Sequence, residues 1–539
     1  MKKLIVNFCC LFILASLIFS IRGSGQAAPV HQGDQTWSPF ENISLTDTSS
    51  TYPTAVGDRS GNVHVFWVED SGGETNKLRF NSDGTPDLDY RGKQINMLTD
   101  SGNTLSYTRW NGKRWVSPTE VQVSAGGRLN FPSATVDSDG MLHAIWFAGL
   151  NREQDMWYSR APANQADQVK SWSHPVIITG EILTAYYPAS IQSTSTGELH
   201  ILYYQVRPNP GVFVISSFDG GDTWDNPVQV YENYSLTGEE DGSMPVRLMV
   251  DDNDRLHATW TRYDLSGNGK AIYYSQSLDQ GNTWSEPFEV AIWTNGLYEM
   301  DWLSVGVAGD EIHLTWEGGE RAFQNERISY DGGKTWTPAQ RIMNRLVGEN
   351  GWADIVTDSN NKLHMITVKR IDGNGIIVYG PWYSTQINGQ WAIPILIGIS
   401  DVNLYAQINN VDSRAVTSLL QGTILGDGLR YQQSVIVNGN ELFVILVNEH
   451  DGEIYSSRLL LDAPQVAPEI YNIPHETATI EATPLKPTQS PSAMETPAYS
   501  TDPEVFSETM LQKSIYLSLV PVLVLIFGTV TYFVLLRRK

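Results

Sequence analysis

The stretch Ser277-Leu-Asp-Gln-Gly-Asn-Thr-Trp284 decides the fold, because close copies of it occur at two other places in the chain. Residues 217–224 read Ser-Phe-Asp-Gly-Gly-Asp-Thr-Trp, and residues 329–336 read Ser-Tyr-Asp-Gly-Gly-Lys-Thr-Trp, so five of the eight positions are fixed. Asp and Ser/Thr side chains hold the backbone donors of a tight turn, glycine supplies a positive φ, and tryptophan buries a large ring beside the turn. Each copy therefore predicts a tight turn between two strands.

These turns belong to a longer repeat that fills residues 28–462. Each unit carries an aromatic or apolar residue with proline, an Asp/Gly turn, a Leu-His strand, a Tyr-Ser strand, the turn motif and a short last strand. Five of its histidines are 57, 57, 56 and 51 residues apart: His143, His200, His257, His313 and His364. The strands are short and rich in Val, Ile, Thr, Tyr and Trp, without a helical period. Tandem four-stranded units predict an all-β fold, a β-propeller.

We count seven blades in this propeller. The last unit, with strands near 434–437, 441–448 and 453–461, lacks its own outer strand. A matching segment stands at the front of the repeat, at Thr36–Ile43. A ring has no exposed sheet edge only if its first and last blades are joined, so we expect residues 36–43 to complete the last blade.

The two ends of the chain differ from the repeat. Residues 1–27 are typical of a signal peptide and contain both cysteines, so we expect no disulfide in the exported protein. Residues 463–513 are rich in Pro, Thr, Ser and Glu and predict a disordered stalk. Residues 514–536 form an apolar run long enough for one transmembrane helix, and the basic residues 537–539 indicate a cytoplasmic tail. We therefore expect a single-pass protein of the cell membrane, with the propeller on the extracytoplasmic side.

The repeated turn resembles the Asp box of the sialidase and BNR-repeat families, closely over three turns and loosely over the surrounding repeats. This resemblance implies a propeller. Because the familiar sialidase propeller has six blades, six is the alternative, with the last unit as an appendage. In that family the chemistry lies on the face opposite the boxes. Asp219, Asp279 and Asp331 are therefore expected to clamp turns rather than to catalyse. The histidines, which recur in nearly every unit, are expected to serve packing.

The opposite face should carry the loops that follow each second strand, and these loops contain arginines. Five successive units contribute at least one each: Arg152, Arg207, Arg262, Arg321 and Arg370. A fork of guanidinium groups could hold one carboxylate bidentately, as the arginine cluster of sialidases holds sialic acid. The alternative is that each arginine pairs in solvent with a neighbouring acid. The net charge of −24 argues against nucleic acids as partners.

Candidate catalytic residues gather in the link before the fifth unit. Tyr298, Glu299, Asp301 and Trp302 lie within five residues, and Glu317 follows the second strand of that unit. Sialidases resemble this set in using a tyrosine nucleophile, a neighbouring glutamate and a separate aspartate. The alternative is an ordinary polar loop with an anchoring aromatic residue.

One family motif has no match. Sialidases carry an early Arg-Ile-Pro motif, and residues 51–54 read Thr-Tyr-Pro-Thr at that place. Arg247, on a first strand of the fourth unit, is a candidate relative of the missing arginine.

Together these patterns predict a cell-surface, carbohydrate-active propeller, a sialidase-like glycoside hydrolase acting on acidic sugars. The alternatives are a non-catalytic glycan-binding or adhesion module and a propeller that engages another protein. We expect a monomer whose partner is a glycan or glycoconjugate, with no cofactor and no metal.

Overall fold

The computed structural model describes the repeat region with some gaps. The described residues are 36–46, 48–70, 76–78, 96–98, 104–123, 128–150, 153–179, 183–184, 188–207, 209–233, 245–263, 269–292, 301–319, 321–344, 346–348, 353–373, 376–398 and 429–471. The expected signal peptide, transmembrane helix and basic tail, and the stalk beyond residue 471, lie outside them. Within the described residues no helix is long and apolar enough to cross a membrane.

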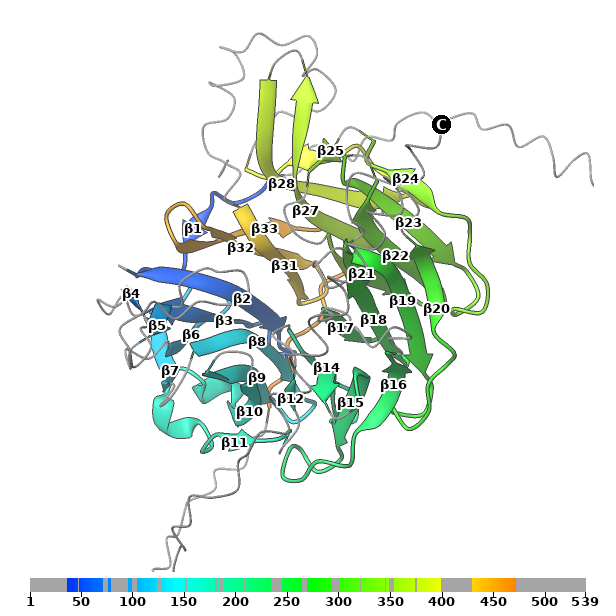
Figure 1. Cartoon of the computed structure of the whole chain (residues 1–539). Helices are drawn as coiled ribbons and strands as arrows, with labels where there is room; N and C mark the ends of the chain where they lie inside the picture. The colour runs from blue at the N-terminus through cyan, green and yellow to red at the C-terminus, as the bar shows by residue number, and fades with distance from the viewer. Residues whose placement is uncertain are drawn as a thin grey trace, which may run out of the picture. The chain divides into compact units, whose positions relative to one another are not determined.

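Seven four-stranded blades make up the described part of the chain, and the all-β, seven-bladed prediction is confirmed (Figure 1). The first three blades are β2 (Ser49–Gly57), β3 (Val63–Asp70), β6 (Thr104–Trp110) and β7 (Thr119–Val123); then β8 (Arg128–Val136), β9 (Met141–Leu150), β10 (Glu153–Pro162) and β11 (Val176–Ile177); then β13 (Ser190–Ser193), β14 (Leu199–Arg207), β15 (Gly211–Ser217) and β16 (Val228–Glu232). Strand β12 (Leu183–Thr184) pairs with both β10 and β14 and so joins the second and third blades.

The other four blades follow the same order from the innermost strand outward. They are β17 (Val246–Val250), β18 (Leu256–Tyr263), β19 (Gly269–Ser277) and β20 (Phe288–Ile292); β21 (Asp301–Ala308), β22 (Glu311–Gly318), β23 (Phe323–Ser329) and β24 (Gln340–Ile342); β26 (Asp354–Thr357), β27 (Leu363–Gly373), β28 (Ile376–Ile387) and β30 (Ile395–Leu396); and β31 (Leu429–Val437), β32 (Glu441–Asn448), β33 (Glu453–Leu460) and β1 (Glu41–Asn42). Short strands β25 (Leu346–Val347) and β29 (Gln390–Trp391) extend the sixth blade, and β4 (Asn76–Leu78) pairs with β5 (Asn96–Leu98).

The first described strand closes the ring, as the sequence predicted. Strand β1 pairs antiparallel with β33, and Trp37 forms a further bridge with Leu459. The innermost strands contact one another in ring order, and β31 contacts β2. Ile43 is buried, and the Trp37 ring packs edge-on against Tyr383 at 5.3 Å between centroids. Hydrophobic burial therefore adds to the two-residue pairing that holds the last blade to the N-terminal segment.

The three Asp boxes are turn clamps. In each box the aspartate accepts hydrogen bonds from the backbone N–H and the hydroxyl of the threonine four residues later; Asp219 accepts them from Thr223 at 2.9 and 2.5 Å. Asp279 and Asp331 repeat this pattern. The bonds from Thr223 lower the pKa of Asp219 to about 2. We call the face with these turns the box face and the opposite one the pocket face.

The histidines connect strands inside the blades through hydrogen bonds. In four blades a buried histidine joins a tyrosine hydroxyl through Nδ1 at 2.7–2.8 Å and an aspartate through Nε2 at 3.0–3.1 Å. The sets are His64 with Tyr107 and Asp58, His143 with Tyr158 and Asp137, His257 with Tyr274 and Asp251, and His364 with Tyr383 and Asp358. A carboxylate only accepts hydrogen bonds, so Nε2 donates to the aspartate and Nδ1 accepts a hydrogen bond from the tyrosine hydroxyl. Their packing role is confirmed.

His313 departs from this pattern because it lies between two carboxylates. Its Nδ1 and Nε2 are each 2.7 Å from a glutamate oxygen, on Glu326 and Glu311 respectively. Burial opposes the charged ring, but the hydrogen bonds with Glu311 and Glu326 outweigh it and raise the pKa of His313 to about 9.

Stability is therefore expected to depend on the charge of His313. The folded pKa lies above the usual value of 6.5, so the contribution is full below pH 6.5 and is lost as pH rises through about 9. The free energy of unfolding should fall by on the order of 3 kcal/mol over that range, at 1.36 kcal/mol per pKa unit. Urea unfolding at pH values from 6 to 10 measures this change in the free energy of unfolding. A His313→Gln variant should lack this slope, and an equally steep fall in that variant would contradict the assignment.

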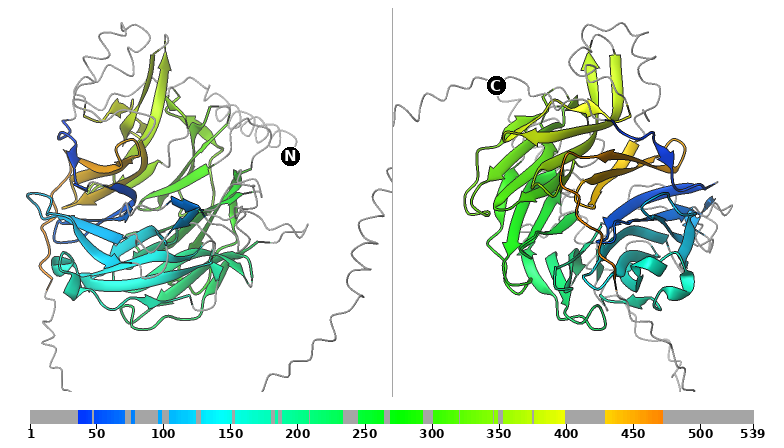
Figure 2. Two further views of the ribbon diagram at one scale, coloured as in Figure 1. Left: turned by 60° about the vertical axis from the view of Figure 1, so that its left-hand side comes forward. Right: turned by 180° about the vertical axis from the view of Figure 1, so that it is seen from behind.

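A C-terminal strap, residues 463–471, crosses the box face (Figure 2, right, orange). It contacts the turns between the first and second strands of four blades. Ser359 Oγ donates to Pro464 O at 2.5 Å, and Val466 N donates to Asn438 O at 2.8 Å. Glu469 N donates to Arg59 O at 2.7 Å, and Arg59 N donates to the Tyr471 hydroxyl at 2.9 Å. The Tyr471 ring covers Gly140, where a Cβ would lie 2.3 Å from a ring carbon.

Candidate functional site

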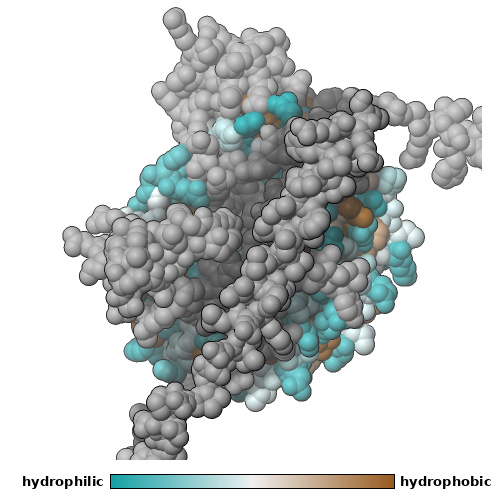
Figure 3. Space-filling model, viewed as in Figure 1, coloured by the Kyte–Doolittle hydropathy of each residue, from teal (hydrophilic) through white to brown (hydrophobic). Residues whose placement is uncertain are grey.

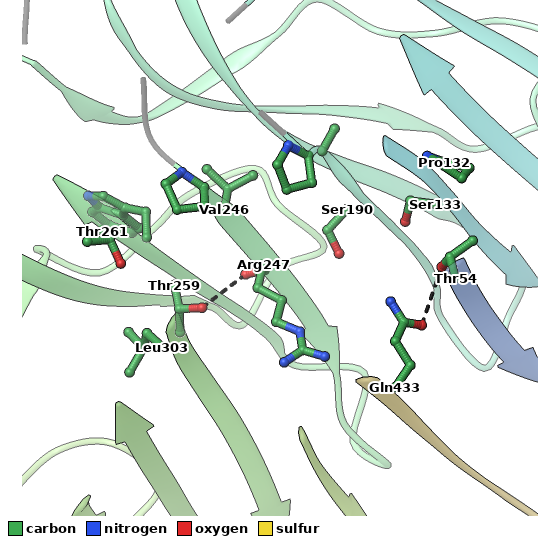
Figure 4. A pocket seen from close by; sticks show the side chains of 14 residues that line it. Thr54, Pro132, Ser133, Ser190, Val246, Arg247, Thr259, Thr261, Leu303 and Gln433 are labelled. Carbon is green, nitrogen blue, oxygen red and sulfur yellow. Dashed lines mark hydrogen bonds between the residues drawn. The ribbon is translucent and has the colours of Figure 1, made fainter. Parts of the chain in front are cut away.

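A small cavity of about 90 Å³ opens at the ring axis on the pocket face (Figure 4). It lies where the innermost strands begin, and several of these strands start with a bulge: the β-pairing shifts register after Thr51, Asn130, Asp301 and Arg430. The described lining residues are Thr54, Pro132, Ser133, Pro188, Ala189, Ser190, Pro245, Val246, Arg247, Thr259, Trp260, Thr261, Leu303 and Gln433. A bulge re-aims side chains locally, so the prolines and small polar residues surround the mouth.

Arg247 is the cationic side chain among the described residues of this cavity. It belongs to β17, and Figure 4 shows its guanidinium extended between Ser190, Leu303 and Gln433. Its Nη2 forms an ion pair with Asp354, and its Nη1 donates to Ser304 Oγ at 2.8 Å. The Arg247 side chain is 27% exposed and that of Asp354 is 9% exposed. The guanidinium is therefore fixed in direction while part of it still faces solvent.

Neighbouring blades fix the groups around Arg247. Asp354 Oδ2 also accepts a hydrogen bond from Ser434 N at 2.5 Å. Gln433 Oε1 accepts one from Ala55 N at 2.7 Å and a longer one from Thr54 Oγ1 at 3.5 Å. These bonds connect the fourth, fifth, sixth, seventh and first blades around the axis. A charged group held by several blades is preorganised, which lowers the entropy cost of binding.

Below the cavity, a channel of about 620 Å³ continues along the axis to the box face. Its lining includes Arg247 and Asp354 at one end and Asp251, Asp252 and Asp358 at the other. Val466 of the strap also lines it. The end near the pocket face thus holds the paired charges of Arg247 and Asp354, whereas the end near the box face holds three carboxylates.

Several predicted site residues fall where side chains are not described. Arg152, Tyr298 and Glu299 lie outside the described residues. Arg207, Asp301 and Trp302 are described by their backbone alone, in β14 and β21. Asp301 stands opposite Glu317 in the register of β21 and β22, and Leu303, two residues on, lines the cavity. The roles of these six residues stay predictions.

The structure places Glu317 in a buried ion pair. Its Oε1 accepts a hydrogen bond from Lys369 Nζ at 2.6 Å, and both side chains are at most 1% exposed. Lys369 Nζ also donates to Ala322 O and Gly348 O, each at 3.1 Å. This pair joins the fifth and sixth blades. In this state Glu317 serves as an interblade clamp, and its proposed catalytic role stays a prediction.

The three predicted arginines with described side chains do not line the axial cavity. Arg370 Nη1 donates to the Tyr379 hydroxyl at 2.8 Å, and its guanidinium lies over that ring. Arg321 is exposed, and its carbonyl accepts a hydrogen bond from Gly348 N at 3.1 Å. Arg262 is half-buried on β18, next to Thr261 of the cavity. Glu317, Arg321 and Arg370 therefore meet around Gly348, and Arg262 stands apart from them on the fourth blade.

Arg247 lines the cavity, although its place in the sequence gives little sign of a binding role. Its local pattern, Val246-Arg247-Leu248, reads like any strand with alternating polarity. The available signal was the register of the repeat: the corresponding positions in other blades carry the small polar residues Ser133, Ser190 and Ser304. Among the described residues, no group of three or more His, Cys, Asp or Glu side chains could hold a metal ion.

Comparison with known proteins gives structural neighbours only. No protein-family model matches the chain, and no curated protein matches it. The solved structures that it resembles include a protein of unknown function from Dyadobacter fermentans, with 14% identity, 80% of this chain and 100% of that chain covered, and a TM-score of 0.45. A PL25 ulvan lyase bound to a GlcA-Rha3S saccharide has 9% identity, coverages of 80% and 97%, and a TM-score of 0.48.

A sialidase is also among these neighbours. The NanB sialidase from Streptococcus pneumoniae has 12% identity, covers 79% of this chain and 71% of its own, and has a TM-score of 0.40. Neighbours at these identities and TM-scores do not reveal the function of this chain.

Proposed function

We propose that this propeller binds an acidic glycan in its axial cavity, with the carboxylate of the sugar at Arg247. The observation that carries this proposal is the partly exposed guanidinium held at the axis by Asp354 and Ser304. An arginine fork matches a carboxylate in shape as well as charge. The hydroxyls of Thr54, Ser133 and Thr261 and the amide of Gln433 suit sugar hydroxyls, and Trp260 with three prolines supplies apolar surface.

A second candidate function is hydrolysis of such a glycan. Its support is the place of Asp301 and Glu317, which are paired in the register of β21 and β22, with Asp301 two residues from cavity-lining Leu303. Glycosidases use two carboxylates, or a tyrosine with carboxylates, near the scissile bond. Hydrolysis would require Glu317 to leave its pair with Lys369 or to act through it, so binding is the function that we propose first.

The proposal extends to location. The two ends of the sequence favour an exported, membrane-anchored chain with the propeller on the extracytoplasmic side.

An Arg247→Lys substitution tests the binding proposal. It keeps the charge beside Asp354 but removes the fork, so affinity for 3′-sialyllactose or a glucuronic acid oligosaccharide should fall about 10- to 100-fold, the equivalent of one charge-assisted hydrogen bond of 1.5–3 kcal/mol. Calorimetric titration of both variants measures this loss.

The matched control is Arg341→Lys, on the outer strand β24, where the arginine stacks on Phe323. It should bind like the wild type, and neutral lactose should bind neither protein. Unchanged affinity in Arg247→Lys would refute the proposal. Release of fluorophore from a fluorogenic sialoside would support the second candidate, whereas binding without turnover supports the first alone.

A further inference from the structure

A second cavity, which we call the seam groove, lies on the outside of the ring where it closes. It has a volume of about 450 Å³. It is bounded by β1 and β33 of the last blade and by the turn between β6 and β7 of the first blade. The last and first blades are neighbours in Figure 1. Its lining residues are Ser38, Pro39, Phe40, Glu41, Trp110, Lys113, Arg114, Trp115, Phe443, Ser456, Ser457 and Arg458.

The charge of this groove is opposite to that of the protein. Three of its side chains are cationic, Lys113, Arg114 and Arg458, and one is anionic, Glu41, in a chain with a net charge of −24. Arg458 pairs with Glu441 at 2.6 Å. Among the described residues, Lys113 and Arg114 form no ion pair, and both are exposed. On the face of the molecule that Figure 3 shows, the described residues at the surface are mostly hydrophilic. The two cations are therefore available to an anion.

The turn that carries these cations is rigid. Asn111 Oδ1 accepts hydrogen bonds from the backbone N–H of Lys113 and of Arg114, each at 3.1 Å. Gly112 has a φ of 83°, which an L side chain rarely adopts. The side chains of Lys113 and Arg114 thus start from a fixed backbone, and less entropy is lost when they bind.

Aromatic rings form the floor of the seam groove. Trp115 is half-buried and lies against Trp110 at 5.9 Å and Phe443 at 6.1 Å between ring centroids. Trp110 and Phe443 are almost fully buried, and the Arg458 guanidinium covers the Trp110 ring at 4.6 Å. An aromatic ring fixed by its neighbours offers a flat apolar surface of the kind that packs against the C–H face of a sugar ring.

A related turn in the sixth blade carries neither cation. Asn388-Gly-Gln-Trp391 has the same Asn-Gly start and also ends in a tryptophan, but it is one residue shorter and has a single glutamine where the blade 1 turn has Lys113 and Arg114. Both Asn388 and Gly389 have a positive φ, whereas in the blade 1 turn Gly112 has one and Asn111 does not. Trp391 Nε1 donates to Glu326 Oε1 at 2.7 Å, whereas Trp115 lines a cavity.

We propose that the seam groove binds an anionic sugar residue, with Lys113 and Arg114 at its carboxylate or sulfate and Trp115 beneath its ring. A sugar fits better than a highly charged polymer, because the acidic protein repels polyanions at long range while a single charged residue meets the local cations. This site lies at the outer edge of the ring and does not depend on the axial cavity. It would give the propeller two separate contacts with an acidic glycan.

Titration of tryptophan fluorescence in the full chain tests the seam groove. The probes are trigalacturonate, which carries carboxylates, and an unsaturated chondroitin sulfate disaccharide, which adds a sulfate; lactose is the neutral probe. Binding of one or both anionic probes should quench fluorescence saturably and weaken as salt is raised. A Lys113→Gln/Arg114→Gln variant should bind at least 10-fold more weakly, and Trp115→Phe should lose most of the quenching.

The control variant is Lys334→Gln/Arg341→Gln, which removes the same charge from the fifth blade. It should bind the probes as the wild type does. An equal loss in the control, equal binding of lactose, or no saturable quenching by either anionic probe would overturn the proposal.

Discussion

Replacing Lys369 with methionine is expected to lower the free energy of unfolding by about 3–5 kcal/mol, the usual cost of breaking a buried ion pair by removing one partner. Lys369 is fully buried, and its ammonium group donates to Glu317 at 2.6 Å and to the carbonyl groups of Ala322 and Gly348. Methionine fills much of the volume but donates no hydrogen bond. The Glu317 carboxylate then remains buried without its cation, and both carbonyl groups lose a donor.

Urea unfolding of Lys369→Met, Glu317→Leu and the double variant measures this pair. Because the double variant removes both charges, its loss should be clearly smaller than the sum of the two single losses. The control is Glu441→Gln, which breaks the exposed pair with Arg458 and should cost less than about 1 kcal/mol. Additive losses in the cycle would show that the two charges act independently and would contradict the interblade clamp.

Removing residues 36–44 is also expected to have a large effect, because it should open the ring. This segment contributes β1, buried Trp37 and buried Ile43. Deleting a buried tryptophan side chain costs about 3–5 kcal/mol and a buried isoleucine about 2–5 kcal/mol. Their sum is comparable to the whole stability of an ordinary domain. The shortened chain should therefore unfold at a much lower temperature, and its free β33 edge should promote association.

Thermal unfolding and light scattering of chains that begin at residue 36 or at residue 45 test the closure. A synthetic peptide of residues 36–44 added in trans should restore part of the lost stability. Ile43→Val keeps the strand and should cost only about 0.5–1.5 kcal/mol. If the shorter chain melted like the longer one and stayed monomeric, the N-terminal strand would not close the ring in solution.

The fold could be predicted because its signals are local and repeated. Each Asp box encodes its own turn through side chains four residues apart, as in the bonds between Asp279 and Thr283. The same recurrence indicated that histidines such as His143 have a structural role inside the blades. Closure could be inferred because Thr36–Ile43 supplies the strand that the last unit lacks.

The site was harder to predict because it forms only when blades assemble. Arg247 meets Asp354, 107 residues away, and Glu317 meets Lys369, 52 residues away. Nothing within a single unit distinguishes a carboxylate that will be buried against a lysine from one that will face a substrate. The same limit applies to the seam groove, where Arg458 from the last blade covers Trp110 of the first.

The strap across the box face gives the propeller a mechanical property. Tension on the chain beyond Tyr471 would reach the ring through Arg59, Asn438 and Ser359, on turns of three different blades. These hydrogen bonds would be loaded and broken one after another, beginning at Tyr471, before the pull reaches the last strand, β33. β33 is also the strand that β1 joins to close the ring. A tethered propeller would therefore shed its strap first and keep its ring intact, so that force at the tether reaches the axial cavity last.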